Sequence, residues 1–109
     1  MSEKFPETMR VAVLSTAHMT PHDAEELNIC VNARGDVYGG ASKCIVDSTP
    51  YGWFVHILSE ESLDAQFERL KSFSSDFVQV MQAAKEEHYQ KVLFDRDGPV
   101  SEHFAKHDW

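Results

Sequence analysis

The spacing of hydrophobic positions changes in the middle of the chain. In the first half, short apolar runs lie between turn residues, and the first of them, Arg10–Leu14, is typical of a buried strand. In the second half, Leu63, Phe67 and Leu70 fall at positions i, i+4 and i+7, which places them on one helical stripe. The pattern therefore predicts mainly strands first and helices later.

A short helix is predicted soon after the first strand. Its start signal lies at Thr20–Asp23, because Thr20 can cap the helix, Pro21 suits the first helical position and Asp23 can complete a capping box. We expect this helix to end near Asn28.

Three strands are predicted in the middle of the chain. Ile29–Ala33 and Val37–Val46 have the pattern of a hairpin around the turn residues at 34–36. A second turn at Thr49–Gly52 places a proline where a type I or II turn favours it, and the strand Trp53–Leu58 follows.

The rest of the chain predicts two helices and a last strand. The serine-rich segment Ser72–Ser75 indicates a break with a fresh helix cap, so two helices are favoured over one long helix. Lys91–Phe94 is the last predicted strand. The order β-α-β-β-β-α-α-β predicts an α+β (α/β) fold, with a mixed sheet of about five strands and two to three helices mainly on one face.

The length of 109 residues fits a single domain covering residues 1–109. We expect residues 1–9 to be flexible and residues 100–109 to form a tail that is packed or partly ordered. No apolar run is long enough to cross a bilayer, and the polar start lacks the pattern of a secretory signal. These features predict a cytoplasmic protein, and its two cysteines fit a reducing compartment.

The formal net charge of −8, from 18 acidic and 10 basic residues, bears on the choice of partner. Such a charge repels nucleic acid and attracts basic surfaces, so direct binding to DNA or RNA is disfavoured. A basic protein or ribonucleoprotein partner is compatible with it. Simple solubility explains the charge equally well.

One possible ligand, metal or catalytic set follows the first and last predicted strands. If these strands are parallel neighbours, their carboxyl ends bring His18 close to Asp95 and Asp97, where open sheets of this class place ligands. A histidine and two aspartates can form a general-base or hard-metal set. The alternative is a solvated turn at Asp95–Gly98 and a histidine bonded to nearby backbone. No phosphate-binding loop or Gly-x-Ser-x-Gly motif is present, and we predict no cofactor.

Acidic side chains concentrate on the predicted helices. A net negative outer face of this kind can be presented to the lysines and arginines of a partner, although a solvated helix face has the same composition. Exposed aromatic side chains are expected to anchor such a contact. The predicted partner-binding residues are Glu60, Glu61, Asp64, Glu68, Tyr51, Trp53 and Trp109.

Short motifs in a fixed order carry a family resemblance that spans most of the chain. They are Leu14–His18, Tyr51–Val55, Leu93–Gly98 and the terminal Asp-Trp pair. Together they resemble a bacterial domain family of unknown function whose members occur on plasmids, prophages and integrative elements. The chain departs from that family's pattern in the strand at 37–46 and the helix at 63–70.

A weaker similarity links the segments Leu14–His18 and Asn28–Val31 to small phage anti-CRISPR proteins. This resemblance implies a non-catalytic acidic protein of a phage or mobile element, which inhibits a CRISPR-type defence complex of the bacterial host by occupying its basic surface. One alternative is a small metal-dependent or hydrolytic enzyme using His18 with Asp95 and Asp97. Another is a structural or regulatory domain that forms a homodimer through an exposed sheet edge.

Overall fold

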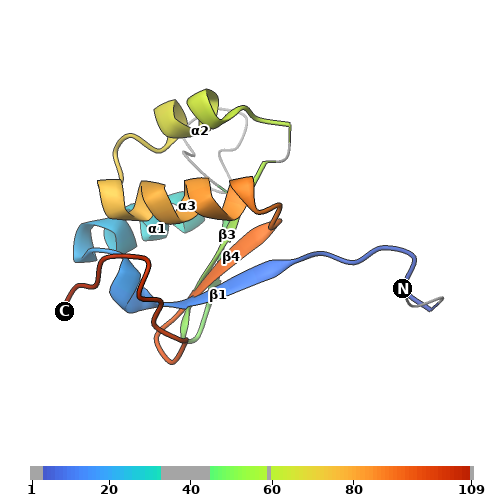
Figure 1. Ribbon diagram of the computed structural model, residues 1–109. Coiled ribbons are helices and arrows are strands. Elements are labelled where there is room, and N and C mark those ends of the chain that lie inside the picture. Colours follow the sequence, from blue (N-terminus) through green and yellow to red (C-terminus); the bar gives the residue numbers. More distant parts are fainter. Residues whose placement is uncertain (1–3, 33–44, 59, 109) are drawn as a thin grey trace.

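The computed structural model describes residues 4–32, 45–58 and 60–108 (Figure 1). Three helices and four strands make up this part of the chain, together with one turn of 3-10 helix. In chain order they are β1 (Val11–Ser15), η1 (Thr16–His18), α1 (Pro21–Asn32), β2 (Val46–Thr49), β3 (Gly52–His56), α2 (Leu63–Arg69), α3 (Ser75–Glu86) and β4 (Lys91–Asp95). None of the described helices has the length and apolar character needed to span a bilayer.

The four strands form one mixed sheet in the order β1-β4-β3-β2. β1 and β4 are parallel, with Val13 opposite Leu93 and Ser15 opposite Asp95, whereas β3 is antiparallel to both of its neighbours. The α+β class and the mixed sheet are therefore as predicted. The condition that the first and last strands are parallel neighbours is also met.

The strand predicted at Ile29–Ala33 is wrong, and this error accounts for a sheet of four described strands where about five were expected. Its first four residues continue α1, which ends at Asn32 instead of Asn28. Ala33 and most of the strand predicted at 37–46 lie outside the described residues, and the described end of that segment, Val46, begins β2.

Packing explains why α1 continues through this apolar run. Ala24, Leu27 and Cys30 lie at intervals of three residues and are all buried, while Ile29 on another side of the helix is 57% exposed. Burial of one helical stripe outweighs the strand preference of β-branched residues, because that preference largely reflects packing on a sheet.

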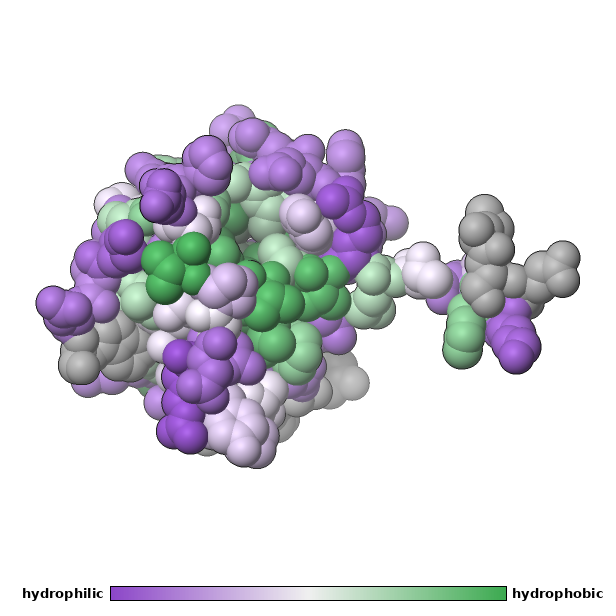
Figure 2. Space-filling model, turned by 60° about the horizontal axis from the view of Figure 1, so that its bottom comes forward, coloured by the Kyte–Doolittle hydropathy of each residue, from purple (hydrophilic) through white to green (hydrophobic). Residues whose placement is uncertain are grey.

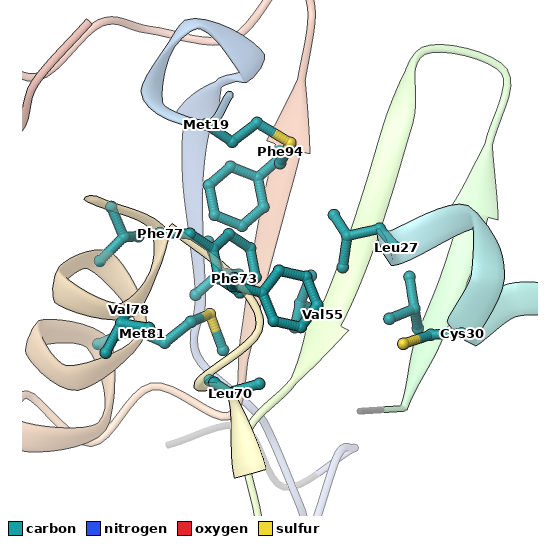
Figure 3. Close-up of a cluster of buried hydrophobic side chains, with 14 of the residues drawn as sticks. Met19, Leu27, Cys30, Val55, Leu70, Phe73, Phe77, Val78, Met81 and Phe94 are labelled. Carbon is teal, nitrogen blue, oxygen red and sulfur yellow. The ribbon is translucent and has the colours of Figure 1, made fainter. Parts of the chain in front are cut away.

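The core lies between the helices and one face of the sheet (Figure 3). The Phe73 ring stacks on Phe77 with centroids 4.4 Å apart, and Phe77 stacks on Phe94 of β4 at 5.4 Å. Phe77 and Met81 bury one side of α3 in this core. The stripe predicted at Leu63, Phe67 and Leu70 is buried only at Leu70, since Phe67 is 53% exposed and Leu63 is 38% exposed.

A buried carboxylate joins the first turns of two helices. Asp23 accepts a hydrogen bond from the Thr20 amide at 2.9 Å, and its own amide donates to the Thr20 hydroxyl at 3.1 Å, so the predicted capping box is confirmed. Asp23 also accepts hydrogen bonds from the amide (2.7 Å) and the hydroxyl (2.5 Å) of Ser74, whose hydroxyl caps α3. The predicted helix break before α3 is confirmed as well.

All three helices lie on one side of the sheet (Figure 1). The other face presents Val13, Leu93 and Phe54 in one row across β1, β4 and β3. Figure 2 shows hydrophobic side chains gathered in the middle of the side that lies below the sheet in Figure 1. This face, which no described helix covers, is therefore apolar.

Candidate functional site

An open pocket of about 600 Å³ lies where β1 and β4 end and β2 turns into β3. We call it the carboxyl-edge pocket. Its walls come from four separate parts of the chain. They are Ser15, Thr16 and Ala17 after β1, Asn28 of α1, the turn region Ser48, Thr49, Pro50, Tyr51, Gly52 and Trp53, and Arg96, His107 and Asp108 from the end of the chain.

Two aromatic side chains and an arginine lie together in the wall of the pocket. Tyr51, at the tip of the β2–β3 turn, is 52% exposed, and the guanidinium carbon of Arg96 lies 5.0 Å from the centre of its ring. The Arg96 amide also donates to the Tyr51 carbonyl at 2.9 Å. Trp53 is held from the other side, because its indole Nε1 donates to the Asn28 side-chain oxygen at 3.1 Å. The backbone and α1 therefore fix these groups.

Glycine at position 52 is required by the close approach of β3 to β4. A Cβ built on Gly52 would lie 1.7 Å from the Phe94 carbonyl oxygen, which no side chain can tolerate without moving the backbone. This approach brings the Tyr51 turn beside Arg96.

The turn after β4 rests on the end of β1 in a similar way. A Cβ on Gly98 would lie 2.6 Å from the Leu14 carbonyl oxygen, and the Ser15 amide donates to the Pro99 carbonyl at 2.7 Å. The motif residues after both parallel strands therefore meet through backbone contacts.

His18 lies under this edge of the sheet rather than at the pocket surface. The imidazole is fully buried, its Nε2 accepts a hydrogen bond from the Ser101 amide at 2.8 Å, and its Nδ1 lies 2.9 Å from the Ala105 carbonyl oxygen. Because a backbone amide can only donate, Nε2 is the acceptor and Nδ1 carries the proton. His18 thus fastens the C-terminal tail, which is the alternative role considered for it from the sequence.

The two aspartates lie in the turn that follows β4. Asp95 accepts a hydrogen bond from the Asp97 amide at 2.8 Å, and the Asp97 side chain is 79% exposed. Both ring nitrogens of His18 bond to the tail backbone, so the imidazole makes no bond to either carboxylate. Within residues 4–32, 45–58 and 60–108, no three His, Cys, Asp or Glu side chains come together in a way that can hold a metal ion.

The four acidic residues predicted to bind a partner lie around α2, and none of them lines the pocket. Glu60 and Asp64 are exposed, whereas Glu61 accepts two hydrogen bonds from the Arg69 guanidinium at 2.8 and 2.9 Å. These bonds, more than any other influence, lower the pKa of the Glu61 carboxyl below its ordinary value. Glu68 pairs with Lys71 at 3.3 Å. The chain's own cations therefore neutralise half of this acidic set.

Of the three aromatic residues predicted to bind a partner, the structure brings Tyr51 and Trp53 together, and Trp109 lies outside the described residues. Sequence reasoning missed the role of Arg96, Asn28 and the tail.

The tail is held by His107. Its amide donates to the Ala17 carbonyl at 2.7 Å, and its ring Nε2 lies 2.9 Å from an Asp76 carboxylate oxygen. The order of the short motifs was the one available signal for the pocket, because each motif contributes residues to its wall.

Comparison with known proteins places these motifs in one family. A family model described as "Family of unknown function (DUF5983) C-terminal domain" matches residues 11–109, which begin at the first residue of β1 and include every described element. No curated protein and no solved structure matches the chain.

Proposed function

Because this chain belongs to the DUF5983 family of unknown function, we propose its function from the carboxyl-edge pocket. The chain is a non-catalytic binding protein that holds a basic protein or ribonucleoprotein partner at this edge of its sheet. The gathering of Tyr51, Trp53 and Arg96 in one open pocket carries the proposal. These three residue types are enriched among the few residues that carry most of the binding energy in protein interfaces.

The pocket residues are both accessible and held in place. Tyr51 is 52% exposed and the Arg96 side chain 64% exposed, so a partner can reach both. The stacking of Arg96 on Tyr51 and the Trp53–Asn28 hydrogen bond favour this arrangement before a partner arrives. Such preorganisation lowers the entropy lost on binding.

The acidic surface has a separate part in this proposal. A net charge of −8 attracts a basic partner over long distances and raises the association rate. Glu60 and Asp64, which have no ion pair with a described residue, contribute to this field. In this proposal the acidic residues around α2 attract the partner, and the pocket residues hold it. The two groups do not form one continuous binding face.

A narrower form of the proposal names the partner class. The similarity to anti-CRISPR proteins supports a protein of a phage or mobile element that inhibits a defence complex in the cytoplasm of the bacterial host. The enzymatic alternative has less support, because the backbone of the tail occupies both ring nitrogens of His18.

The decisive experiment begins with a pull-down from host lysate and mass spectrometry of the captured proteins. The partner is then titrated with Tyr51→Ala and Arg96→Ala variants. We expect each to weaken binding by about tenfold or more, mainly through faster dissociation. Phe67→Ala is the matched control, since Phe67 is an aromatic residue of α2 with 53% exposure and lies outside the pocket.

Charge reversal separates steering from anchoring. Glu60→Lys with Asp64→Lys leaves the Glu61–Arg69 ion pair intact, and we expect it to slow association and reduce the salt dependence of binding. The proposal fails if the pocket variants bind like the wild type. A substrate turned over by the purified chain would support the enzymatic alternative instead.

A further inference from the structure

β1 is an edge strand whose outer side is open along most of its length. Two hydrogen bonds define the direction of its backbone groups: the Arg10 carbonyl accepts from the Gln90 amide beside β4, and the Ser15 amide donates to the Pro99 carbonyl of the tail. Backbone groups alternate in direction along a strand. The amides and carbonyls of Val11 and Val13 therefore point away from β4, and the tail bonds to the backbone of this edge at Ser15.

This edge lacks the features that usually keep edge strands apart. From Met9 to Ser15 the one charged residue is Arg10, and its guanidinium is held by the Glu87 carbonyl and the Tyr89 ring. There is no proline and no inward-pointing charge in the segment. An uncharged, extended edge of this kind is prone to pair with another strand.

The segment before β1 prolongs the same edge. Residues 4–9 leave the body of the molecule as an arm that continues beyond the start of β1 (Figure 1). Two apolar side chains on this arm are exposed, Phe5 by 63% and Met9 by 57%. Met9 lies two residues before Val11, so its backbone groups lie on the same side as those of Val11 and Val13.

The uncovered face of the sheet gives the arm a place to bind. Side chains alternate between the two faces of a strand, so in an extended segment Met9 shares the face of Val11 and Val13, which also carries Leu93 and Phe54. An apolar side chain from the arm of a second copy can pack on this row.

We infer that this chain forms a symmetric dimer in which β1 of one copy pairs antiparallel with β1 of a second copy, centred on Val11. This register uses Met9, Val11 and Val13, the outward-pointing residues to which the tail does not bond, because Met9 of each copy then faces Val13 of the other. A register centred on Val13 would need the Ser15 amide, which the tail already occupies. The occupant of the edge is thus a second copy. Its β1 and arm form the backbone hydrogen bonds that the open edge of this copy leaves unmade.

The arms also provide the contact area that the strands alone cannot. A stable interface buries about 1,600 Å² in total, more than the pairing of two short strands supplies. Each arm lying along the partner's uncovered sheet face extends the contact and covers Met9. The apolar row at Val13, Leu93 and Phe54 then continues across the dimer.

Charge gives this dimer an unusual signature. Each copy carries a net charge of −8, so the copies repel each other over long distances, and added salt screens that repulsion. We expect dimerisation to strengthen with salt. Capture of a basic partner is expected to weaken with salt, so the two events are distinguishable.

The inference is tested by sedimentation velocity on the full chain at low and moderate salt, with charged substitutions at facing positions. We expect a dimer for the wild type and a monomer for Val13→Lys and for Met9→Glu. We expect the double variant to recover the dimer, because each introduced lysine then faces an introduced glutamate. Ile29→Lys, at a 57% exposed residue of α1, is the matched control and stays dimeric. Circular dichroism checks that every variant is folded.

Several outcomes overturn the inference. They are a monomeric wild type at every salt concentration, single variants that dimerise like the wild type, and a double variant that stays monomeric. The last result indicates contact between the apolar sheet faces, which a charge at Met9 would not restore. The carboxyl-edge pocket is not part of this edge, so the Val13→Lys variant should keep its affinity for a partner if the proposed function is right.

Discussion

The carboxyl edge of the sheet and the helix α2 both carry residues predicted to bind a partner, but they differ in what holds their side chains in place. At the sheet edge, the Arg96 amide bonds to the Tyr51 carbonyl, the Ser15 amide bonds to Pro99, and His18 fastens the tail from below. Around α2, side chains of the same surface pair with one another, as Glu61 does with Arg69.

This difference separates a constructed site from a charged surface. Sequence distance hides the first, since its walls come from residues as far apart as Thr16 and Asp108. The charged surface around α2 can be recognised from the sequence, because its acidic residues lie close together along the chain. A count of charges therefore draws attention to α2, while the backbone contacts that make a pocket lie elsewhere.

The strongest way to break the sheet edge is Gly52→Ala. The added Cβ collides with the Phe94 carbonyl, and we expect a loss of about 4 kcal/mol in the free energy of unfolding, measured by denaturant titration. Gly98→Ala meets the Leu14 carbonyl at a longer distance and should cost about half as much. Equal stability of the Gly52 variant and the wild type would contradict the close approach of β3 and β4.

The next largest effect is expected for His18→Ala. The change leaves a cavity and removes the acceptor of the Ser101 amide and the donor to Ala105, at a cost of about 3 kcal/mol. Faster hydrogen exchange at the Ser101 amide would show that the tail has loosened. Asp97→Asn, at a 79% exposed residue of the neighbouring turn, should change the stability by less than about 0.5 kcal/mol.

The smallest effect is expected at α2, where a side-chain ion pair holds the surface in place of backbone contacts. Glu61→Gln removes one ion pair at a cost of about 0.5–1 kcal/mol near neutral pH. The pKa of Glu61 is lower in the folded chain than its ordinary value of 4.5, so its stabilisation is present above that pH and is lost as the pH falls through the folded value. Unfolding curves of the variant and the wild type should therefore converge in acid. A gap that widens in acid would contradict this assignment.

Much of the fold could be predicted because its signals are local. The capping box at Thr20–Asp23, the serine cap before α3 and the turn at Pro50 each depend on a few adjacent residues. The end of α1 could not be predicted in the same way. Ile29–Val31 has the composition of a strand, and burial of its neighbours against the core decides for a helix.

The candidate site could be predicted only in part for a related reason. Tyr51 and Trp53 could be selected by residue type. Arg96 could not, because its position beside Tyr51 depends on the sheet order and on the absence of a side chain at Gly52. Parallel strands allow a set of His18 with Asp95 and Asp97, with a backbone-bonded histidine as the alternative. The 3-10 turn after β1 directs the ring into the core, in agreement with that alternative.

Asp23 has a consequence for how the molecule opens. One carboxylate accepts hydrogen bonds from the first turn of α1 and from the cap of α3, although 51 residues separate Asp23 from Ser74. If either helix start frays, the buried carboxylate loses some of its hydrogen-bond donors while it stays shielded by the other helix. This loss raises the free energy of the partly opened state. The two helix starts should therefore unfold as a single cooperative unit.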